Sequence, residues 1–312
     1  MGDLIIFAEP NLIIMIRNLL VLLLTFSLSL SAQEKHKLIG FAENKGQIID
    51  QNGSPNPNVK FLLNSRGLNV QLRKNGFSYD VYENRKVPMT EADLRKRKNL
   101  NLDETEKKNL PDYSLEAVNH RVDIDFEGSD AGVVLEGSGK SKDYDNYYTV
   151  KHAPEGVLMV HKFEKVTYKN LYPNVDVVFF VPADSTKVVE YNFIVRPGGK
   201  VGDIKMKFNG VKTDLEDSKI KMKTRFGVME ETLPLSWTEA GRERNEVKVG
   251  YKKIKKNVYG FDFDESQISG KTVVIDPVPV RLWGTYYAND VSSSTMDLIT
   301  DSANNVYISG ST

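Results

Sequence analysis

The chain has 312 residues, 42 lysines and arginines balanced by 42 aspartates and glutamates, 40% hydrophobic residues and no cysteine. This composition is ordinary for a soluble globular protein of one or two domains, and it excludes a disordered chain, a disulfide framework, a thiolate metal site and a cysteine nucleophile. The zero net charge removes the general electrostatic argument for a nucleic-acid partner or an anionic membrane surface.

The first element is an apolar run at Leu19–Leu30, preceded by Arg17 and followed by Ser31-Ala32-Gln33. This order of features is typical of a secretory signal peptide, and the run is shorter than the roughly 20 residues that span a bilayer. We expect a signal peptide over residues 1–32, with Met15 as the true start, and no stable membrane span after cleavage. An uncleaved membrane anchor is the alternative.

Strand-like runs follow at Val59–Leu63 and Leu68–Leu72. Asn75-Gly76 separates the second run from residues 77–82, which is a hairpin signal because both turn residues tolerate a positive φ. The domain is therefore expected to open with hairpins.

Residues 84–111 are highly charged, with acids and bases interleaved and few large apolar side chains. This pattern favours a solvated insertion between strands, and a basic patch for an anionic polymer is the alternative. Within the insertion, Thr90 and Asp93 predict a capped short helix over Glu91–Lys98.

Tyr144, Tyr147 and Tyr148 form an aromatic cluster after a further alternating segment at Val118–Phe126. Their rings are the candidate glycan contacts of this chain. Packing of the same rings against the core, at the lip of a strand, is the alternative.

The strongest strand pattern lies in residues 170–208. Apolar side chains occupy nearly both faces of residues 175–181, which predicts a central strand. A second run at Lys187–Val195 and a third at residues 204–208 follow after turn signals, the last of them Pro197-Gly198-Gly199. Together the runs predict a meander of antiparallel strands.

A row of lysines, Lys219, Lys221 and Lys223, alternates with apolar residues beyond this stretch. The row predicts a half-buried strand whose lysines protect a sheet edge or, with Lys205 and Lys207, form a cationic stripe for acidic polysaccharide. Further along, prolines at 277 and 279 mark the domain boundary.

The four histidines are His36, His120, His152 and His161, and their spacing matches no metal site. The last two would meet across a hairpin if they flank one, although solvated histidines fit the pattern better.

The acidic residues show no catalytic spacing either. Asp143–Asn146 lacks the glycine and glutamate of a calcium loop. Asp123 and Asp125 alternate on one strand, as do Asp262 and Asp264, which suits a solvent face rather than the facing carboxylates of a glycosidase. We therefore expect no enzyme activity, no cofactor and no metal.

Several motifs together resemble a known bacterial family. They are FAENKGQ at 41–47, YKNLYPNVDVVFF at 168–180, VEYNFIVRPGG at 189–199, GDIKMKFNGV at 202–211, ETLPLSW at 231–237 and VVIDPVPVRLWGTYY at 273–287. Over about Leu38–Thr312 the chain is similar to the uncharacterised N-terminal domain of secreted proteins that carry SBBP-type β-propeller repeats. The chain departs from the repeat at Ala288-Asn289, where a glycine pair is usual, and at Asn304, which replaces a turn glycine.

The resemblance implies that residues 285–312 are one repeat unit, closed by the strand Val306–Thr312. One unit cannot close a propeller, which needs about four to eight. The chain is therefore expected to be a fragment of a longer protein.

The expected fold is all-β: an antiparallel β-sandwich, single or paired, over residues 38–279 with a charged insertion at about 84–111, and then the first, incomplete unit of a β-propeller over 280–312. The resemblance implies a secreted or bacterial cell-surface structural or adhesion module, not catalytic itself, that presents the propeller to an extracellular glycan or surface protein. One alternative is the non-catalytic accessory region of a secreted polysaccharide-degrading enzyme. Another is a lectin-like module acting through Tyr144, Tyr147 and Tyr148.

Overall fold

The computed structural model describes residues 39–65, 67–99, 103, 111–183, 187–232, 235–241, 243–267, 270–281, 294–300 and 306–311. The chain divides into two compact units, Met1–Leu38 and Ile39–Thr312. The signal peptide predicted at residues 1–32 lies outside the described residues.

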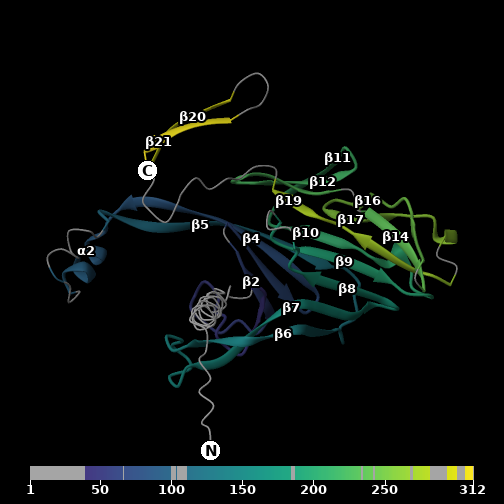
Figure 1. The fold of residues 1–312 in the computed structure, drawn as a ribbon, viewed down its shortest axis with the longest axis horizontal. Coiled ribbons are helices and arrows are strands. Elements are labelled where there is room, and N and C mark those ends of the chain that lie inside the picture. The colour runs from purple at the N-terminus through teal and green to yellow at the C-terminus, as the bar shows by residue number, and fades with distance from the viewer. Residues whose placement is uncertain are drawn as a thin grey trace, which may run out of the picture. The chain divides into compact units, whose positions relative to one another are not determined.

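The second unit is built almost entirely of antiparallel strands (Figure 1). They are β1 (Phe41–Glu43), β2 (Val59–Asn64), β3 (Leu68–Arg73), β4 (Gly76–Pro88), β5 (Tyr113–Phe126), β6 (Val134–Tyr147), β7 (Val157–Tyr172), β8 (Val175–Phe180), β9 (Glu190–Val195), β10 (Met206–Asn209), β11 (Lys212–Glu216), β12 (Lys219–Thr224), β13 (Gly227–Glu231), β14 (Leu235–Ala240), β15 (Glu243–Glu246), β16 (Gly250–Lys255), β17 (Val258–Asp262), β18 (Thr272–Asp276), β19 (Pro279–Arg281), β20 (Ser294–Thr300) and β21 (Val306–Ser311). The helices of the described residues are α2 (Glu91–Lys98) and the 3-10 turns η1 (Val201–Asp203) and η2 (Glu265–Gln267). The all-β prediction is confirmed.

One sheet of 15 strands runs in the order β15-β14-β18-β9-β8-β7-β1-β2-β3-β4-β5-β10-β17-β16, with β6 paired to β7 outside this path. The long strand β7 joins the two halves of the sheet. One edge of β7 pairs first with β1 and then with β8, and its other edge pairs with β6. Smaller sheets are formed by β11-β12-β13-β19 and by β20-β21.

Strand β8 lies between β7 and β9, as expected of a central strand. Val175, Val177 and Phe179 are fully buried on one face, and Asp176 is buried on the other. The predicted meander is right for the first two runs, since β8 pairs with β9, and wrong for the third run, because β10 pairs with β5 and β17 instead of β9. The turn after residue 196 and the 3-10 turn η1 with its buried Val201 carry the chain away from β9.

Aromatic side chains fill the centre of the core. The ring of Phe77 lies 5.0 Å from that of Phe179, 5.4 Å from that of Tyr191 and 5.7 Å from that of Phe126. The four-stranded sheet contributes Ile220, Met222 and Met229 to the same core. Burial of each large apolar side chain stabilises the fold by roughly 1.5 to 3 kcal/mol, so this cluster dominates the energetics.

The charged insertion is shorter than expected. Strand β4 continues to Pro88, and β5 begins at Tyr113, so residues 84–88 pair with residues 113–117 as the outer part of a long hairpin. The helix predicted at Glu91–Lys98 is present as α2, with Thr90 and Asp93 forming a reciprocal capping box. Exchange of hydrogen bonds between these two residues satisfies backbone donors that the helix start would otherwise leave open.

The hairpin predicted at Asn75-Gly76 joins β3 to β4, but its turn residues are Lys74 and Asn75, since Arg73 pairs with Gly76. Neither turn residue has a positive φ. Gly76 is needed for a different reason: a Cβ there would lie against the carbonyl oxygen of Ile124 and 3.0 Å from the Cα of Asp125.

Gly76→Ala should therefore lower the free energy of unfolding by roughly 1 to 3 kcal/mol, the usual cost of overpacking, because the obstructing atoms belong to the backbone of β5. Gly250→Ala is the matched control: it also lies in a strand, and a Cβ there meets no atom within 4 Å. Urea denaturation of both variants checks the prediction. Equal stability of the two variants would contradict it.

Past the predicted boundary at Pro277 and Pro279, β19 still pairs with β13. A strand lies where the closing strand of the repeat was expected, namely β21, and it pairs with β20. In the part of the chain that the structure describes, no helix is both long and apolar enough to cross a membrane.

Candidate functional site

Strand alternation builds a polar outer face on β3, β4 and β5. On β4 and β5, Phe77 pairs with Ile124, and both side chains enter the core. The next pair along, Ser78 with Asp123, lies on the opposite face, because successive strand residues point to opposite sides. Polar side chains from the three strands therefore gather on that face, namely Gln71, Arg73, Ser78, Asp80, Arg121, Asp123 and Asp125.

Arg73 is held in place by several acceptors. Its Nε donates to Ser78 Oγ at 3.0 Å, and its Nη2 donates to the carbonyl oxygen of Phe77 at 3.0 Å and to Asp125 Oδ1 at 2.8 Å. Asp125 also accepts from Asn209 Nδ2 at 2.8 Å, which ties β10 to the group. With its side chain only 21% exposed, Arg73 has a fixed orientation.

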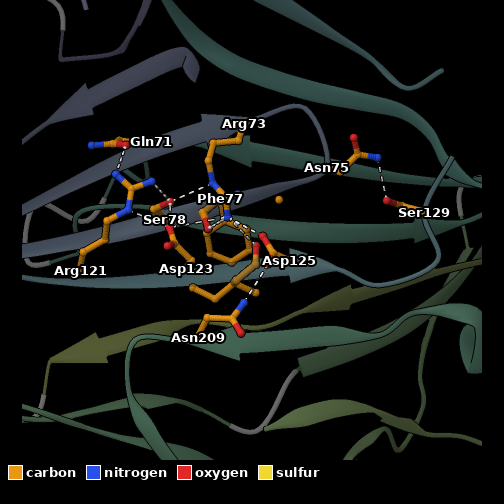
Figure 2. Close-up of polar contacts among 12 residues, drawn as sticks. Gln71, Arg73, Asn75, Phe77, Ser78, Arg121, Asp123, Asp125, Ser129 and Asn209 are labelled. Atoms are coloured by element: carbon orange, nitrogen blue, oxygen red, sulfur yellow. Dashed lines mark hydrogen bonds and ion pairs between the residues drawn. The ribbon is translucent and has the colours of Figure 1, made fainter. Parts of the chain in front are cut away.

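Arg121 approaches the same serine from the other side (Figure 2). It donates from Nη2 to Ser78 Oγ at 3.1 Å, from Nε to Asp123 Oδ1 at 2.8 Å and from Nη1 to Gln71 Oε1 at 2.9 Å. Charge-assisted bonds of this kind are about twice as strong as neutral ones, so the two guanidinium groups are preorganised.

Ser78 is buried at the centre of this network. Its hydroxyl donates to Asp123 Oδ1 at 2.6 Å and accepts from both Arg73 and Arg121. A hydroxyl oxygen has two acceptor sites, and both are occupied by cationic donors. Every hydrogen-bonding position of the Ser78 hydroxyl is therefore occupied, and the hydroxyl holds Arg73, Arg121 and Asp123 in fixed positions.

At one side of the network, the carboxyl group of Asp80 is partly buried. Burial raises the pKa of Asp80 from its usual value, and the amide of Asn119, which donates to Asp80 Oδ2 at 3.1 Å, and the charge of Arg121 oppose the shift. Neighbouring donors thus keep a carboxylate in place on the sheet surface.

A cavity of about 520 Å³ opens beside these arginines. Its lining comes from the turn before β2, the β3–β4 turn and β5: Gln51, Asn56, Asn58, Val59, Arg73, Lys74, Asn75, Arg121 and Asp123. The turn at Asn75 is fastened by its amide, which donates to Ser129 Oγ at 2.9 Å and to the Asp130 carbonyl oxygen at 3.0 Å. The volume lies within the roughly 300 to 1,000 Å³ of small-molecule sites.

The candidate glycan-binding tyrosines lie elsewhere, at the β6–β7 hairpin. Tyr144 is 51% exposed and Tyr148 is 68% exposed. Tyr147 is half-buried and packs against the small cluster of Ala42, Val157 and Val160. The three rings therefore do not form one exposed platform, and two of them are available to solvent.

The described histidines are held by separate groups. His120 bridges β5 to the β10–β13 region, accepting from the Arg225 N–H at 2.9 Å and contacting the Gly210 carbonyl oxygen at 3.0 Å. His152 contacts the Gly46 carbonyl oxygen at 2.7 Å, and His161 contacts that of Ser141 at 2.9 Å. Among the described residues, no group of three or more metal-ligating side chains converges.

The predicted lysine row is neither an edge nor a continuous stripe. Strand β12 lies between β11 and β13, whereas Lys207 lies on β10 in the large sheet. Lys219 pairs with Glu230 at 3.1 Å, and Lys221 pairs with Glu216 at 3.0 Å. Glu216 and Glu230, which lie on the neighbouring strands, therefore neutralise the positive charge of these two lysines.

A buried carboxyl group lies where the two largest sheets meet. Glu231, at the end of β13, accepts from the hydroxyl of Tyr79 at 3.0 Å and from that of Tyr191 at 3.1 Å. Burial raises the pKa of Glu231 to about 7, and the two tyrosine hydroxyls limit the rise. In the described part of the chain no cation pairs with this carboxyl group, so it joins β4, β9 and β13 best in its protonated form.

The comparisons with known proteins give one match. A family model described as a domain of unknown function (DUF7948) covers residues 41–278. Neither the curated proteins nor the solved structures give a match.

Proposed function

We propose that this chain, which belongs to the DUF7948 family, is a structural and adhesion module of a secreted or cell-surface protein. In this role it holds an extracellular glycan without reacting with it. The observation that carries the proposal is the cavity beside Arg73 and Arg121. Both side chains are held by Ser78 and by a neighbouring aspartate before any ligand enters. Preorganised groups of this kind reduce the entropy lost on binding.

The surrounding fold supports a binding role. The charged residues Arg73, Arg121 and Asp123 of the lining lie on strands whose inner faces pack into the aromatic core, so these three side chains project from a rigid surface. Sites on strands are more precisely positioned than sites on loops. The Ser78 hydroxyl already makes three hydrogen bonds, which suits a fixed contact surface better than a reaction centre.

We propose further that the 15-stranded sheet and the four-stranded sheet form a sandwich-like body over a shared core. In this architecture β20 and β21 begin an SBBP-type propeller unit, and residues 1–32 direct export. The body would then carry the propeller at the cell surface and present it to a glycan or protein partner.

A second binding surface is favoured by the exposed rings of Tyr144 and Tyr148. Exposed aromatic rings supply large contact area with a polar end. In this lectin-like alternative the β6–β7 hairpin, rather than the cavity, contacts the sugar.

A glycan array probed with the full exported chain tests the proposal and separates the two surfaces. We expect binding to extracellular glycans, unchanged in a Tyr144→Ala/Tyr148→Ala double variant, and no cleavage of the bound glycans. Loss of binding in the double variant would transfer the function to the hairpin. Absence of binding to every glycan, or release of cleaved products, would contradict the proposal.

A further inference from the structure

The lining of the cavity carries more positive than negative charge. Arg73, Lys74 and Arg121 contribute cations, and Asp123 contributes the carboxylate. Asp123 is already engaged by Arg121 at 2.8 Å and by the Ser78 hydroxyl at 2.6 Å. Lys74 is exposed at the β3–β4 turn and has no ion-pair partner among the described residues.

Donors also remain open on the fixed arginine. Within the described part of the chain, Nη1 of Arg73 makes no hydrogen bond, while its Nε and Nη2 are both engaged. A guanidinium group carries five N–H donors in a fixed plane. Because the occupied nitrogens hold this plane in place, the remaining donors of Arg73 are oriented before binding.

Three further residues of the lining, Gln51, Asn56 and Asn58, are neutral and polar. Their side-chain amides have no hydrogen-bond partner in the described residues. Each amide offers both a donor and an acceptor, which is the combination that a sugar hydroxyl uses. The lining of the cavity thus combines amides with cations.

We propose that this cavity binds an acidic saccharide, with the carboxylate of a uronic acid unit at Lys74 and Arg73 and its hydroxyls at the amides of Asn58 and Gln51. This inference rests on the proposed function and names its ligand class. A carboxylate forms an ion pair as well as hydrogen bonds with these cationic donors, whereas a neutral sugar offers hydrogen bonds alone. A small inorganic anion bound at Lys74 and Arg73 would not use the amides of Asn58 and Gln51.

Isothermal titration of the full exported chain tests the ligand class. The probes are a hexamer of galacturonic acid, the neutral maltohexaose and inorganic sulfate. We expect the acidic hexamer to bind, with affinity that falls as salt rises, and the other two probes to bind at least tenfold more weakly. Equal binding of maltohexaose, or of sulfate alone, would overturn the inference.

Two variants locate the contact. Lys74→Ala should raise the Kd for the acidic hexamer about fivefold to tenfold, the effect of losing a charged hydrogen bond, and Asn58→Ala should raise it by a smaller factor. Lys256→Ala removes an exposed lysine elsewhere and should leave the Kd unchanged. An unchanged Kd in Lys74→Ala would overturn the assignment.

The two experiments separate an error in the ligand class from an error in the proposed function. If the acidic hexamer does not bind while the array shows binding of neutral glycans, the ligand class is wrong and the proposed function stands. If the array also shows no binding to any glycan, both are wrong.

Discussion

Replacing Phe77 with alanine should lower the free energy of unfolding by about 3 to 5 kcal/mol. Phe77 is fully buried and its ring contacts those of Tyr79, Phe126, Phe179 and Tyr191, at centroid distances of 5.0 to 5.7 Å. Its removal deletes buried apolar surface and leaves a cavity that strands from three parts of the sheet cannot close. A loss of this size is a large fraction of the roughly 5 to 15 kcal/mol that stabilises a domain.

Guanidinium denaturation measures this effect. Tyr148→Ala is the control, because its ring is 68% exposed and surface changes usually stay within about 0.5 kcal/mol. If Phe77→Ala does not fold, Phe77→Leu keeps most of the volume and should cost less, about 1.5 kcal/mol. A loss below about 1 kcal/mol in the alanine variant would contradict the aromatic core.

The second large effect concerns the pH dependence of stability. The pKa of Glu231 lies at about 7 in the folded protein, against the ordinary value of 4.5, because burial disfavours its charged form. Between these values the folded state binds the proton more tightly than the unfolded state does. The stability contributed by Glu231 is therefore full below about pH 4.5 and is lost as pH rises toward 7.

Substitution by glutamine isolates this contribution. In Glu231→Gln the side chain stays neutral at every pH, so the stability of wild type relative to the variant should fall by about 2 to 3 kcal/mol between pH 5 and pH 8. Urea denaturation at both pH values measures the difference. Asp276, whose pKa burial raises to about 6, adds a smaller loss in the same direction to both proteins, and the comparison cancels it.

The matched control is Glu243→Gln, which changes an exposed glutamate on β15. It should follow the wild-type pH dependence. A constant difference in stability between wild type and Glu231→Gln from pH 5 to pH 8 would contradict the raised pKa of Glu231, because the buried carboxyl group would then not titrate in this range.

Local signals in the sequence predicted local structure well. The capping pair Thr90 and Asp93 predicted the bounds of α2, because the bonds that start a helix lie within four residues. The apolar faces of residues 175–181 predicted a central strand. The partner of β10 was not predictable, because alternation shows which face is buried and does not show which strand lies alongside.

The candidate site was only partly predictable. Alternation of Asp123 and Asp125 indicated a solvent face, and the structure places both there, together with Arg121 two residues before Asp123 on β5. Their other partner, Arg73, comes from β3 through strand pairings that no short motif records. Glu231 carried no signal at all, since an acid after an apolar strand is ordinary in a sequence. Its burial depends on Tyr79, 152 residues away along the chain.

Hydrogen–deuterium exchange of the full chain, with and without the galacturonic acid hexamer, tests the central claim most directly. A glycan held in the cavity should slow exchange at the backbone amides of residues 56–59 and of the Lys74–Asn75 turn, and leave the β6–β7 hairpin unchanged. Protection confined to the region of Tyr144 and Tyr148, or protection nowhere, would contradict the claim that the preorganised polar face of β3, β4 and β5 is where this protein binds its ligand.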